Sequence, residues 1–286
     1  MHRAQQFWPG KTFAKSTNNM KFWKYQGAGN DFIMLDQRAG QVITRSDTAL
    51  IERMCDRRFG IGADGLILLQ QQAGYDFEMV YFNADGREST MCGNGGRCIA
   101  AFARHLGLAG DLCRFIAIDG PHDAFITASD NPWQETWIEL KMKDVDAVKI
   151  QEGAFVLDTG SPHYVRFTDH LDLKDMVSEG RAVRYSEPFQ AAGINVNLVE
   201  ESPEGLHIRT YERGVEDETL ACGTGVTAAA LATAMQRGVS SGHVDLPVFA
   251  KGGRLSVRFH AHANGSFSDI WLCGPAQQVF EGNWPD

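Results

Sequence analysis

Two segments of the chain repeat the same order of residues. "YFNADGRESTMCGNG" and "YERGVEDETLACGTG" align without a gap, so that Tyr81 and Tyr211 stand eleven residues before Cys92 and Cys222, respectively. In each segment a run of β-formers ending in tyrosine leads through a polar turn to Cys-Gly-x-Gly and then to an alanine-rich helix. A solenoid would need three or more units, so the repeat predicts two similar halves.

The length of the chain also fits two halves. At 286 residues it can hold two domains of ordinary size, and 43% hydrophobic residues can build real cores. The organised pattern begins after Met20, so we expect residues 1–20 to be an N-terminal extension. The pattern restarts after roughly residue 147, where no low-complexity tract or proline-rich linker marks a joint.

The hydrophobic pattern is that of an α+β fold. Helices are expected over residues 47–59, capped by Ser46 or Asp47, and after Gly96 and Gly225. Apolar runs between turn residues predict strands over 65–70, 77–82, 113–118, 123–128, 136–142, 154–158, 163–167, 195–200, 206–212, 254–260 and 269–274.

Charge and composition exclude some classes of protein. The net charge of −9, without a basic stripe, argues against nucleic acid as a partner. No apolar run approaches the roughly 18 residues of a membrane span, so no membrane association is expected. The six cysteines lack CxxC spacing, which is unlike a disulfide framework, and the cytoplasm is the expected compartment.

Each Cys-Gly-x-Gly motif places a thiol at a helix start. The exposed N–H groups of Gly93, Asn94, Gly223 and Thr224 can hold a carboxylate there. The same helix field favours a thiolate, so we expect the thiol pKa to be lowered from about 8.5 toward neutrality.

Other uses of cysteine and glycine remain open on these residues alone. Cys55, Cys113 and Cys273 are expected to be small buried hydrophobes, and Cys98 to face the core. A zinc site needs about four ligands in a recognisable spacing, which neither motif supplies, so no metal is expected. A phosphate cradle stays possible, although neither loop carries a Walker lysine or the dinucleotide spacing.

If both helix starts open into one cleft, two thiols flank a single ligand. That arrangement suits removal of a proton from one face of a carbon and delivery to the other, as in inversion at an amino-acid α-carbon. No lysine stands in an evident Schiff-base motif, so we expect no cofactor. Such a site must rely on dipoles aimed at the substrate carboxylate in a dry cleft.

Several motifs, in this order, resemble the diaminopimelate epimerase family. They are "KYQGAGNDF", "GIGADG", "YFNADG", "MCGNGGRC", "GSPHYV" and "YERGVEDETLACGTG", and the match runs from about Met20 to the C-terminus. The resemblance implies two pseudo-symmetric domains, each a curved, mostly antiparallel sheet wrapped around a central helix. It assigns residues 21–147 plus 275–286 to the first domain and 148–274 to the second.

The resemblance also implies roles for individual residues. Cys92 and Cys222 correspond to the acid and base, His163 to a histidine that assists the first cysteine, and Glu212 to a glutamate near the second. Residues at substrate-holding positions of the family are Asn30, Asn83, Asn195 and Arg213, the last because a guanidinium fork suits a distal carboxylate. Ser161 replaces a frequent asparagine and can still donate to a carboxylate, whereas Gly65 replaces a glutamine found in some members.

The function implied is interconversion of LL- and meso-diaminopimelate for lysine and cell-wall precursor synthesis. Homodimers occur in the family. A racemase for proline or hydroxyproline is the nearest alternative, and Arg213 discriminates against it because such a substrate has no distal carboxylate. A non-catalytic ligand-binding protein, or a redox sensor that bridges Cys92 to Cys222, represents a different class.

Overall fold

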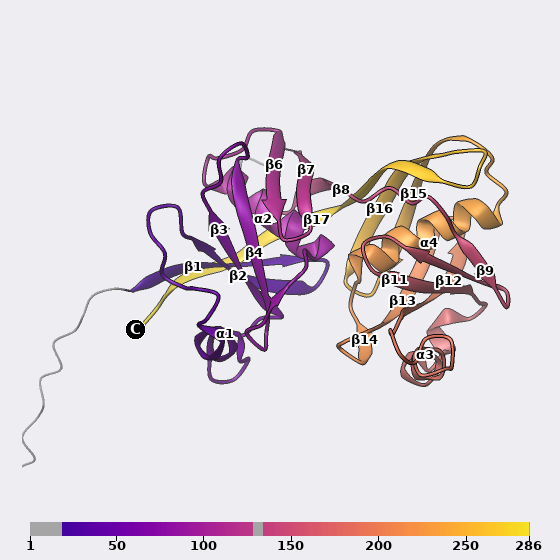
Figure 1. The fold of residues 1–286 in the computed structure, drawn as a ribbon, viewed down its shortest axis with the longest axis horizontal. Coiled ribbons are helices and arrows are strands. Elements are labelled where there is room, and N and C mark those ends of the chain that lie inside the picture. The colour runs from indigo at the N-terminus through magenta and orange to yellow at the C-terminus, as the bar shows by residue number, and fades with distance from the viewer. Residues whose placement is uncertain (1–18, 128–133, 286) are drawn as a thin grey trace, which may run out of the picture.

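Two lobes lie side by side, each with one helix surrounded by strands (Figure 1). The computed structural model describes residues 19–127 and 134–285, so residues 1–18 of the expected extension and residue 128 of a predicted strand lie outside it. Met20, the last residue of the expected extension, is already the first residue of strand β1.

The elements of the first lobe, in chain order, are β1 (Met20–Gly27), β2 (Asn30–Asp36), α1 (Thr48–Cys55), β3 (Gly65–Gln70), β4 (Phe77–Asn83), β5 (Glu88–Ser89), α2 (Gly93–His105), β6 (Leu112–Ala117), β7 (Gly120–Ile126) and β8 (Thr136–Lys141). Those that follow are β9 (Lys149–Gln151), β10 (Ala154–Asp158), β11 (Pro162–Phe167), the 3₁₀ turn η1 (Leu171–Leu173), α3 (Met176–Arg184), β12 (Asn195–Ser202), β13 (Gly205–Glu212), β14 (Asp217–Thr219), α4 (Gly223–Gln236), β15 (Gly242–Ala250), β16 (Gly253–Ala261) and β17 (Phe267–Trp284).

The two lobes share one strand-pairing scheme. In the first, β2 pairs in parallel with β3 and β4 with β6, while the remaining pairs are antiparallel. In the second, β11 pairs in parallel with β12 and β13 with β15, in the same positions of the scheme. The predicted α+β fold of two pseudo-symmetric, mostly antiparallel sheets around central helices is therefore confirmed.

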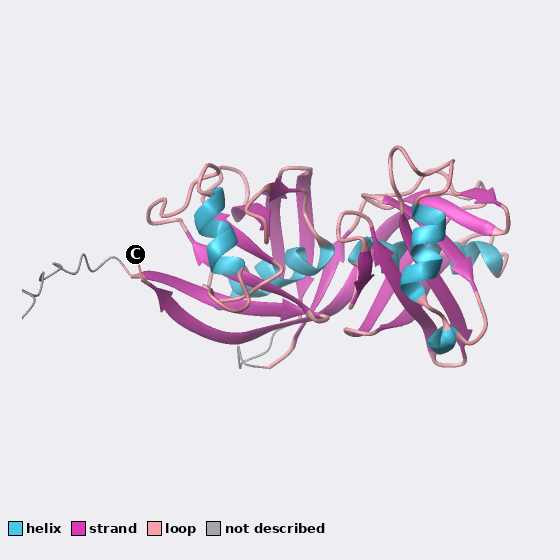
Figure 2. Cartoon of the chain, turned by 90° about the horizontal axis from the view of Figure 1, so that it is seen from below, coloured by secondary structure: helices cyan, strands magenta, loops and turns pink. Residues whose placement is uncertain are grey.

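Strand β17 connects the lobes (Figures 1 and 2). Its first part pairs with β16 of the second lobe, and residues from Gln277 to Trp284 pair with β1 of the first. Between them, Trp271 to Ala276 pair with β8. Both sheets thus belong to one continuous ladder, and the domain limits given above stay a prediction.

The central helix α4 is buried because its surface is small and apolar. From Val226 to Ala234 every residue of α4 is fully buried, and most of them are alanine. A helix that is apolar all round belongs in a core. The helices α1 and α3 instead cover the outer faces of the sheets, each over a smaller hydrophobic cluster.

Helix boundaries differ from the predicted ones. The first helix ends at Cys55 and not at residue 59, because the Asp56 carboxylate accepts the N–H groups of Arg58 and Phe59, both at 2.7 Å, and turns the chain. The central helices begin at Gly93 and Gly223, earlier than predicted, since their glycines form the first turn.

In the structure, the strands that precede the two cysteines correspond with an offset of one residue from the gap-free sequence alignment. Tyr81 pairs with Ser89, whereas Thr210 pairs with Thr219, and both partners stand three residues before their cysteine. Tyr81 therefore corresponds to Thr210. A shift of one residue reverses the face of a strand, so Tyr211 packs in the outer cluster beneath α3. The predicted equivalence of Tyr81 and Tyr211 is wrong.

Candidate active site

The first residues of the two central helices meet between the lobes. A Cβ added to Gly223 would lie 3.3 Å from Gly93 Cα, and one added to Gly93 would lie 3.6 Å from Gly223 Cα. Leu272 of β17 packs against both positions. Because Cys92 and Cys222 immediately precede these glycines as helix N-caps, the structure brings both cysteines to one site.

Asn94 ties the two helix starts together. It is fully buried, and its Nδ2 donates to the carbonyl oxygen of Ala221, at 2.9 Å, from the opposite lobe. Its Oδ1 accepts from Arg97 Nη2 at 2.9 Å. Thus the Asn94 side chain is committed within the protein.

On the side of the first lobe, the Cys92 thiol faces an acceptor. Its Sγ lies 3.6 Å from Asn30 Oδ1, and Cys92 is only partly buried. The orientation of the Asn30 amide is fixed and cannot be flipped by 180°, because its Nδ2 donates to Asp64 Oδ2 at 2.5 Å. The amide oxygen is therefore left facing the thiol and Asn94 Nδ2, which lies 3.4 Å away.

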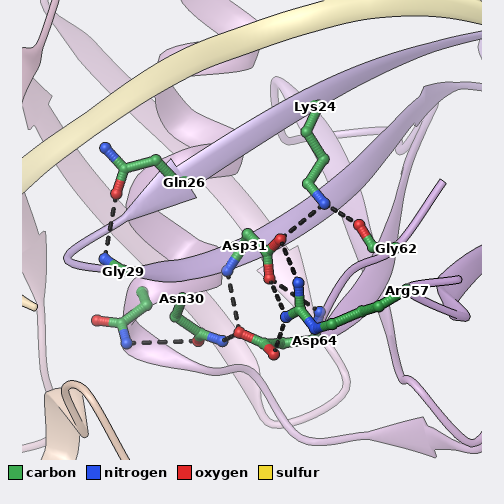
Figure 3. A network of polar contacts seen from close by, with 9 residues as sticks. Lys24, Gln26, Gly29, Asn30, Asp31, Arg57, Gly62 and Asp64 are labelled. Atoms are coloured by element: carbon green, nitrogen blue, oxygen red, sulfur yellow. Dashed lines mark hydrogen bonds and ion pairs between the residues drawn. The ribbon is translucent and has the colours of Figure 1, made fainter.

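A charged network holds Asn30 in this orientation (Figure 3). Arg57 Nη2 donates to Asp31 at 2.7 Å and to Asp64 at 2.6 Å, and Lys24 Nζ lies 2.7 Å from Asp31. Burial alone would raise the pKa of Asp31, but hydrogen bonds and charge from Arg57 and Lys24 hold it at about 2. Asp31 therefore stays ionised, and Asp64 Oδ2 fixes the amide of Asn30 by accepting from its Nδ2.

On the side of the second lobe, Cys222 lies beside a cluster of hydroxyl groups. It is 8% exposed, and its Sγ is 3.4 Å from Thr224 Oγ1. Thr224 Oγ1 lies 2.9 Å from His163 Nε2 and 3.0 Å from Ser161 Oγ, which is itself 3.0 Å from the same ring nitrogen. The predicted site residues Ser161, His163 and Thr224 therefore form one triangle next to Cys222.

His163 lies on the side of Cys222, and its predicted pairing with the first cysteine stays a prediction. The fully buried ring reaches Cys222 through Thr224, and no hydrogen bond joins it to Cys92 in the described part of the chain. Burial lowers the pKa of His163 to about 3, and the charge of Arg213 acts in the same direction. The imidazole is therefore neutral at physiological pH.

Both thiol pKa values also depart from the sequence prediction. Burial raises the pKa of Cys92 and that of Cys222, and the negative charge of Glu212 raises both further. N–H groups at the helix starts, such as those of Gly95 and Gly225, act in the opposite direction but are outweighed. The helix field was predicted correctly in sign, but desolvation is the larger effect.

The remaining predicted residues lie around this centre. Asn195 Nδ2 donates to Ser161 Oγ at 3.2 Å, while its Oδ1 accepts from the Arg213 N–H at 2.8 Å. Arg213 is exposed, and among the described residues no carboxylate pairs with its guanidinium. Glu212 is half-buried, and burial raises its pKa. Asn83 ends β4 opposite Gly65, with its side chain exposed.

The family described as "Diaminopimelate epimerase" matches residues 22–120 and 155–277. The chain belongs to the diaminopimelate epimerase family. It is thus an isomerase of the racemase and epimerase class.

Individual family members are similar over nearly the whole chain. The diaminopimelate epimerase of Flavobacterium psychrophilum is 51% identical over 92% of this chain and 99% of its own length. That of Chlorobaculum tepidum is 42% identical over 90% and 98%, and that of the archaeon Archaeoglobus fulgidus is 34% identical over 91% and 95%.

Solved structures share the fold at low sequence identity. A phenazine biosynthesis protein of the PhzF family from Bacillus anthracis superposes with a TM-score of 0.74 at 16% identity, covering 94% of this chain and 100% of its own. A hydroxyproline epimerase from Agrobacterium vitis, with bound trans-4-hydroxy-L-proline, gives 0.67 at 14% identity, covering 95% and 94%. These likenesses establish the epimerase fold.

In this diaminopimelate epimerase family member, Tyr81 explains the departure at Gly65. A Cβ at residue 65 would lie 2.6 Å from Tyr81 Cε2 and 3.2 Å from its hydroxyl, and would also collide with the carbonyl oxygen of Phe82. The phenol ring therefore occupies the space beside Gly65 that a glutamine side chain would need. The glycine is visible in the sequence, but no sequence pattern indicates the ring that covers it.

Two further polar residues of the site were not predicted. Arg97 is fully buried, and its guanidinium donates to Asn94 Oδ1 and to the carbonyl oxygens of Gly93 and Pro275. Asn197 is also fully buried and lies against His163. Arginine and asparagine inside apolar helix and strand patterns are the available signal, since buried polar groups need partners.

Further expectations from the sequence concern the remaining cysteines, metal ions and membrane-spanning helices. Cys55, Cys98, Cys113 and Cys273 are free and buried, as expected for packing residues. Within residues 19–127 and 134–285, no group of three or more His, Cys, Asp or Glu side chains is placed to hold a metal ion. In the same ranges, no helix has the length and apolar character to cross a membrane.

Proposed function

We propose that this chain interconverts LL- and meso-diaminopimelate, with Cys92 and Cys222 as the two groups that exchange the α-proton. One sulfur, as thiolate, removes the proton from one face of the α-carbon, and the other, as thiol, delivers a proton to the opposite face. The roles are reversed for the reverse reaction. No cofactor takes part in this scheme.

The observation that carries the proposal is the contact between Gly93 and Gly223. It places two cysteines, each the N-cap of a buried helix, at the junction of the lobes. A helix N-terminus presents N–H donors that have no partner within the helix, here those of Gly93 and Gly223, to a ligand carboxylate. As negative charge grows on that carboxylate during proton removal, the same donors stabilise it.

A thiolate must form in a site whose burial disfavours it. The substrate supplies a compensating charge, because its α-ammonium group brings a cation next to the sulfur atoms. In a medium of low dielectric constant this attraction is larger than in water. Binding of the zwitterion is therefore proposed to lower the pKa of the attacking thiol.

Arg213 is proposed to bind the distal carboxylate. It has no carboxylate partner among the described residues, and its backbone N–H is held by Asn195 Oδ1 at 2.8 Å. A bidentate arginine–carboxylate pair selects a substrate with a second acidic end. Asn30, Asn83, Ser161, Asn195 and Thr224 are the proposed polar contacts along the substrate.

His163 and Glu212 are proposed to set the state of the sulfur atoms. His163 acts on Cys222 through Thr224, and Glu212 acts on both thiols by its charge. The reaction places the enzyme in the synthesis of lysine and of peptidoglycan precursor, in the cytoplasm. A homodimer is compatible with the proposal but is not required by it, because both cysteines come from one chain.

The proposal is tested by incubating the purified protein with LL-diaminopimelate in D₂O, beside proline and trans-4-hydroxyproline. Formation of meso-diaminopimelate with deuterium at the inverted carbon, and no exchange in the cyclic amino acids, is the expected result. Exchange into proline or hydroxyproline alone would assign the site to the alternative racemase reaction. Absence of exchange in all three would refute the proposed chemistry.

A further inference from the structure

The two halves of the site differ in what lies beneath their helix starts. Under α2, Gly95 packs on apolar side chains, with its Cβ position 3.1 Å from Ile67 and 3.5 Å from Phe32. Under α4, a Cβ added to the equivalent Gly225 would lie 2.5 Å from Asn197 Oδ1 and 3.3 Å from His163 Cε1. The pseudo-symmetric partner of an isoleucine is thus a buried asparagine.

The strand pairings define this correspondence. Phe32 pairs with Gly65 as His163 pairs with Asn195, and Ile67 pairs with Tyr81 as Asn197 pairs with Thr210. In the lobe that carries Cys222, His163, Asn197 and Thr210 therefore stand where the other lobe has Phe32, Ile67 and Tyr81. A fully buried asparagine costs free energy unless its hydrogen bonds are satisfied, so its partners indicate its use.

The orientation of the Asn197 amide follows from its neighbours. One amide atom lies 3.0 Å from the backbone carbonyl oxygen of Tyr164, which can only accept, so that atom is nitrogen. The other is an oxygen that accepts from Thr210 Oγ1 at 2.9 Å. The same Nδ2 lies 3.0 Å from His163 Nδ1. Since the amide nitrogen can only donate, His163 Nδ1 must accept.

We propose that Asn197 is a positioning residue that holds His163 in the tautomer with the proton on Nε2, so that the Thr224 hydroxyl hydrogen points to Cys222 Sγ. A neutral imidazole whose Nδ1 accepts carries its proton on Nε2. His163 Nε2–H then donates into the triangle that it forms with Thr224 and Ser161.

Counting hydrogens shows the consequence for sulfur. His163 donates to one hydroxyl, and only one further contact, between Thr224 and Ser161, remains inside the triangle. Ser161 and Thr224 carry two hydroxyl hydrogens, so when Ser161 donates in that contact, the Thr224 hydrogen is free to point to Cys222 Sγ, 3.4 Å away. With the other tautomer, Nε2 would accept, one hydroxyl hydrogen would go to the ring and the other to the contact between Ser161 and Thr224, so none would remain for Cys222. The tautomer therefore decides whether Thr224 can stabilise a thiolate.

The assignment of Cys222 as a reacting thiol rests on the proposed function, but the tautomer does not. The test records long-range ¹H–¹⁵N spectra of the full chain with ¹⁵N-labelled histidine, with the His163 signal assigned by its loss in His163→Gln. In the wild type we expect protonated Nε2 and unprotonated Nδ1. A wild-type spectrum with the proton on Nδ1 overturns the proposal, whether or not the enzyme epimerises diaminopimelate.

The matched variant is Asn197→Asp, which keeps the shape of the side chain but replaces the donor by an acceptor. We expect the proton of His163 to move to Nδ1 and the pH at which Cys222 is half alkylated, measured on its own peptide by mass spectrometry, to rise by about one unit. Glu212 and Cys92, the other titratable groups that act on Cys222, are unchanged. A folded Asn197→Asp variant with the wild-type tautomer and alkylation profile contradicts the proposal.

Two further variants complete the experiment. Asn197→Leu removes the donor without adding charge, and we expect a mixture of His163 tautomers with a smaller shift of the Cys222 profile in the same direction. Thr233→Val removes another buried hydrogen bond of α4, from Thr233 Oγ1 to the carbonyl oxygen of Ala229 at 2.8 Å. This control is expected to keep the wild-type profile. If Thr233→Val shifted the Cys222 alkylation profile by the same amount, loss of any buried hydrogen bond of α4 would explain the effect, and the positioning role would be refuted.

Discussion

Gly93 and Gly223 lie in van der Waals contact at the junction of the lobes, where a Cβ on Gly223 would stand 3.3 Å from Gly93 Cα. Each glycine follows a cysteine that caps a buried helix. The contact exists because neither residue has a side chain. The spacing of the two thiols therefore depends on two glycines as much as on the cysteines.

A methyl group at this contact should separate the helix starts. In Gly223→Ala the added Cβ meets Leu272 Cδ2 at 2.8 Å and the Gly93 backbone, which can yield only if the lobes move. We expect a loss of about 1–3 kcal/mol in the free energy of unfolding and a larger relative loss of turnover. Urea unfolding and epimerase assays measure both. Gly110→Ala, at a position with open space, is the control, and normal turnover in Gly223→Ala would contradict the account.

Removal of either thiol should abolish epimerisation without unfolding the protein. We expect Cys92→Ala and Cys222→Ala each to lower kcat by at least about 100-fold, since each deletes one of two proton-transfer groups. Thermal unfolding monitored by circular dichroism checks the fold. Cys113→Ala, which removes a buried cysteine outside the site, should keep its turnover. Near-normal activity in either site variant would exclude the two-thiol assignment.

Arg213 should affect substrate binding more than chemistry. Because its guanidinium is proposed to hold the distal carboxylate, Arg213→Gln is expected to raise KM for LL-diaminopimelate by about 10-fold to 100-fold, with a smaller change in kcat. Steady-state kinetics measures the two constants. Arg237→Gln, at the far end of α4, serves as the matched control. An unchanged KM in Arg213→Gln would remove this residue from the substrate site.

Burial of His163 should make stability depend on pH. Its pKa is about 3 in the folded protein, against 6.5 for an ordinary histidine. Between these values the unfolded chain binds a proton that the folded chain does not, so stability falls as pH decreases, by up to about 1.4 kcal/mol per pH unit.

This dependence is checked by comparing the free energy of unfolding in urea at pH 7 with that at pH 5. Between these two values His163→Gln should lose about 2 kcal/mol less stability than the wild type, because the buried histidine no longer contributes. His243→Gln, which removes an exposed histidine of β15, should behave like the wild type. Equal losses in His163→Gln and the wild type would show that His163 is not a buried neutral ring.

The repeat, the α+β class and the two helices that follow cysteine could be predicted because each leaves a local pattern. Every strand proposed from alternating or clustered apolar residues corresponds to a strand of the fold, within the described residues. The outer helix α3 was missed, and it lies in a polar stretch where only Met176 and Gly180 are buried. The extended partners β1, β2 and β15 were missed as well.

Contacts between residues of different strands could not be predicted from the sequence. The one-residue offset that pairs Tyr81 with Ser89 but Thr210 with Thr219 depends on how each hairpin turns. The link from His163 to Cys222 depends on the packing of β11 against the start of α4, where Thr224 lies between them, and desolvation of the thiols depends on their burial in the folded chain. Sequence spacing identifies such residues, but it does not show which residues each of them contacts in the fold.

The central claim is that two sulfur atoms act on opposite faces of one carbon. The most direct measurement is the deuterium content of both isomers after brief reaction of LL-diaminopimelate in D₂O. We predict deuterium at the inverted α-carbon of the meso product and protium at that carbon in the recovered LL substrate. Protium retained in the product, or equal deuterium in product and recovered substrate, would indicate a single base and contradict the claim.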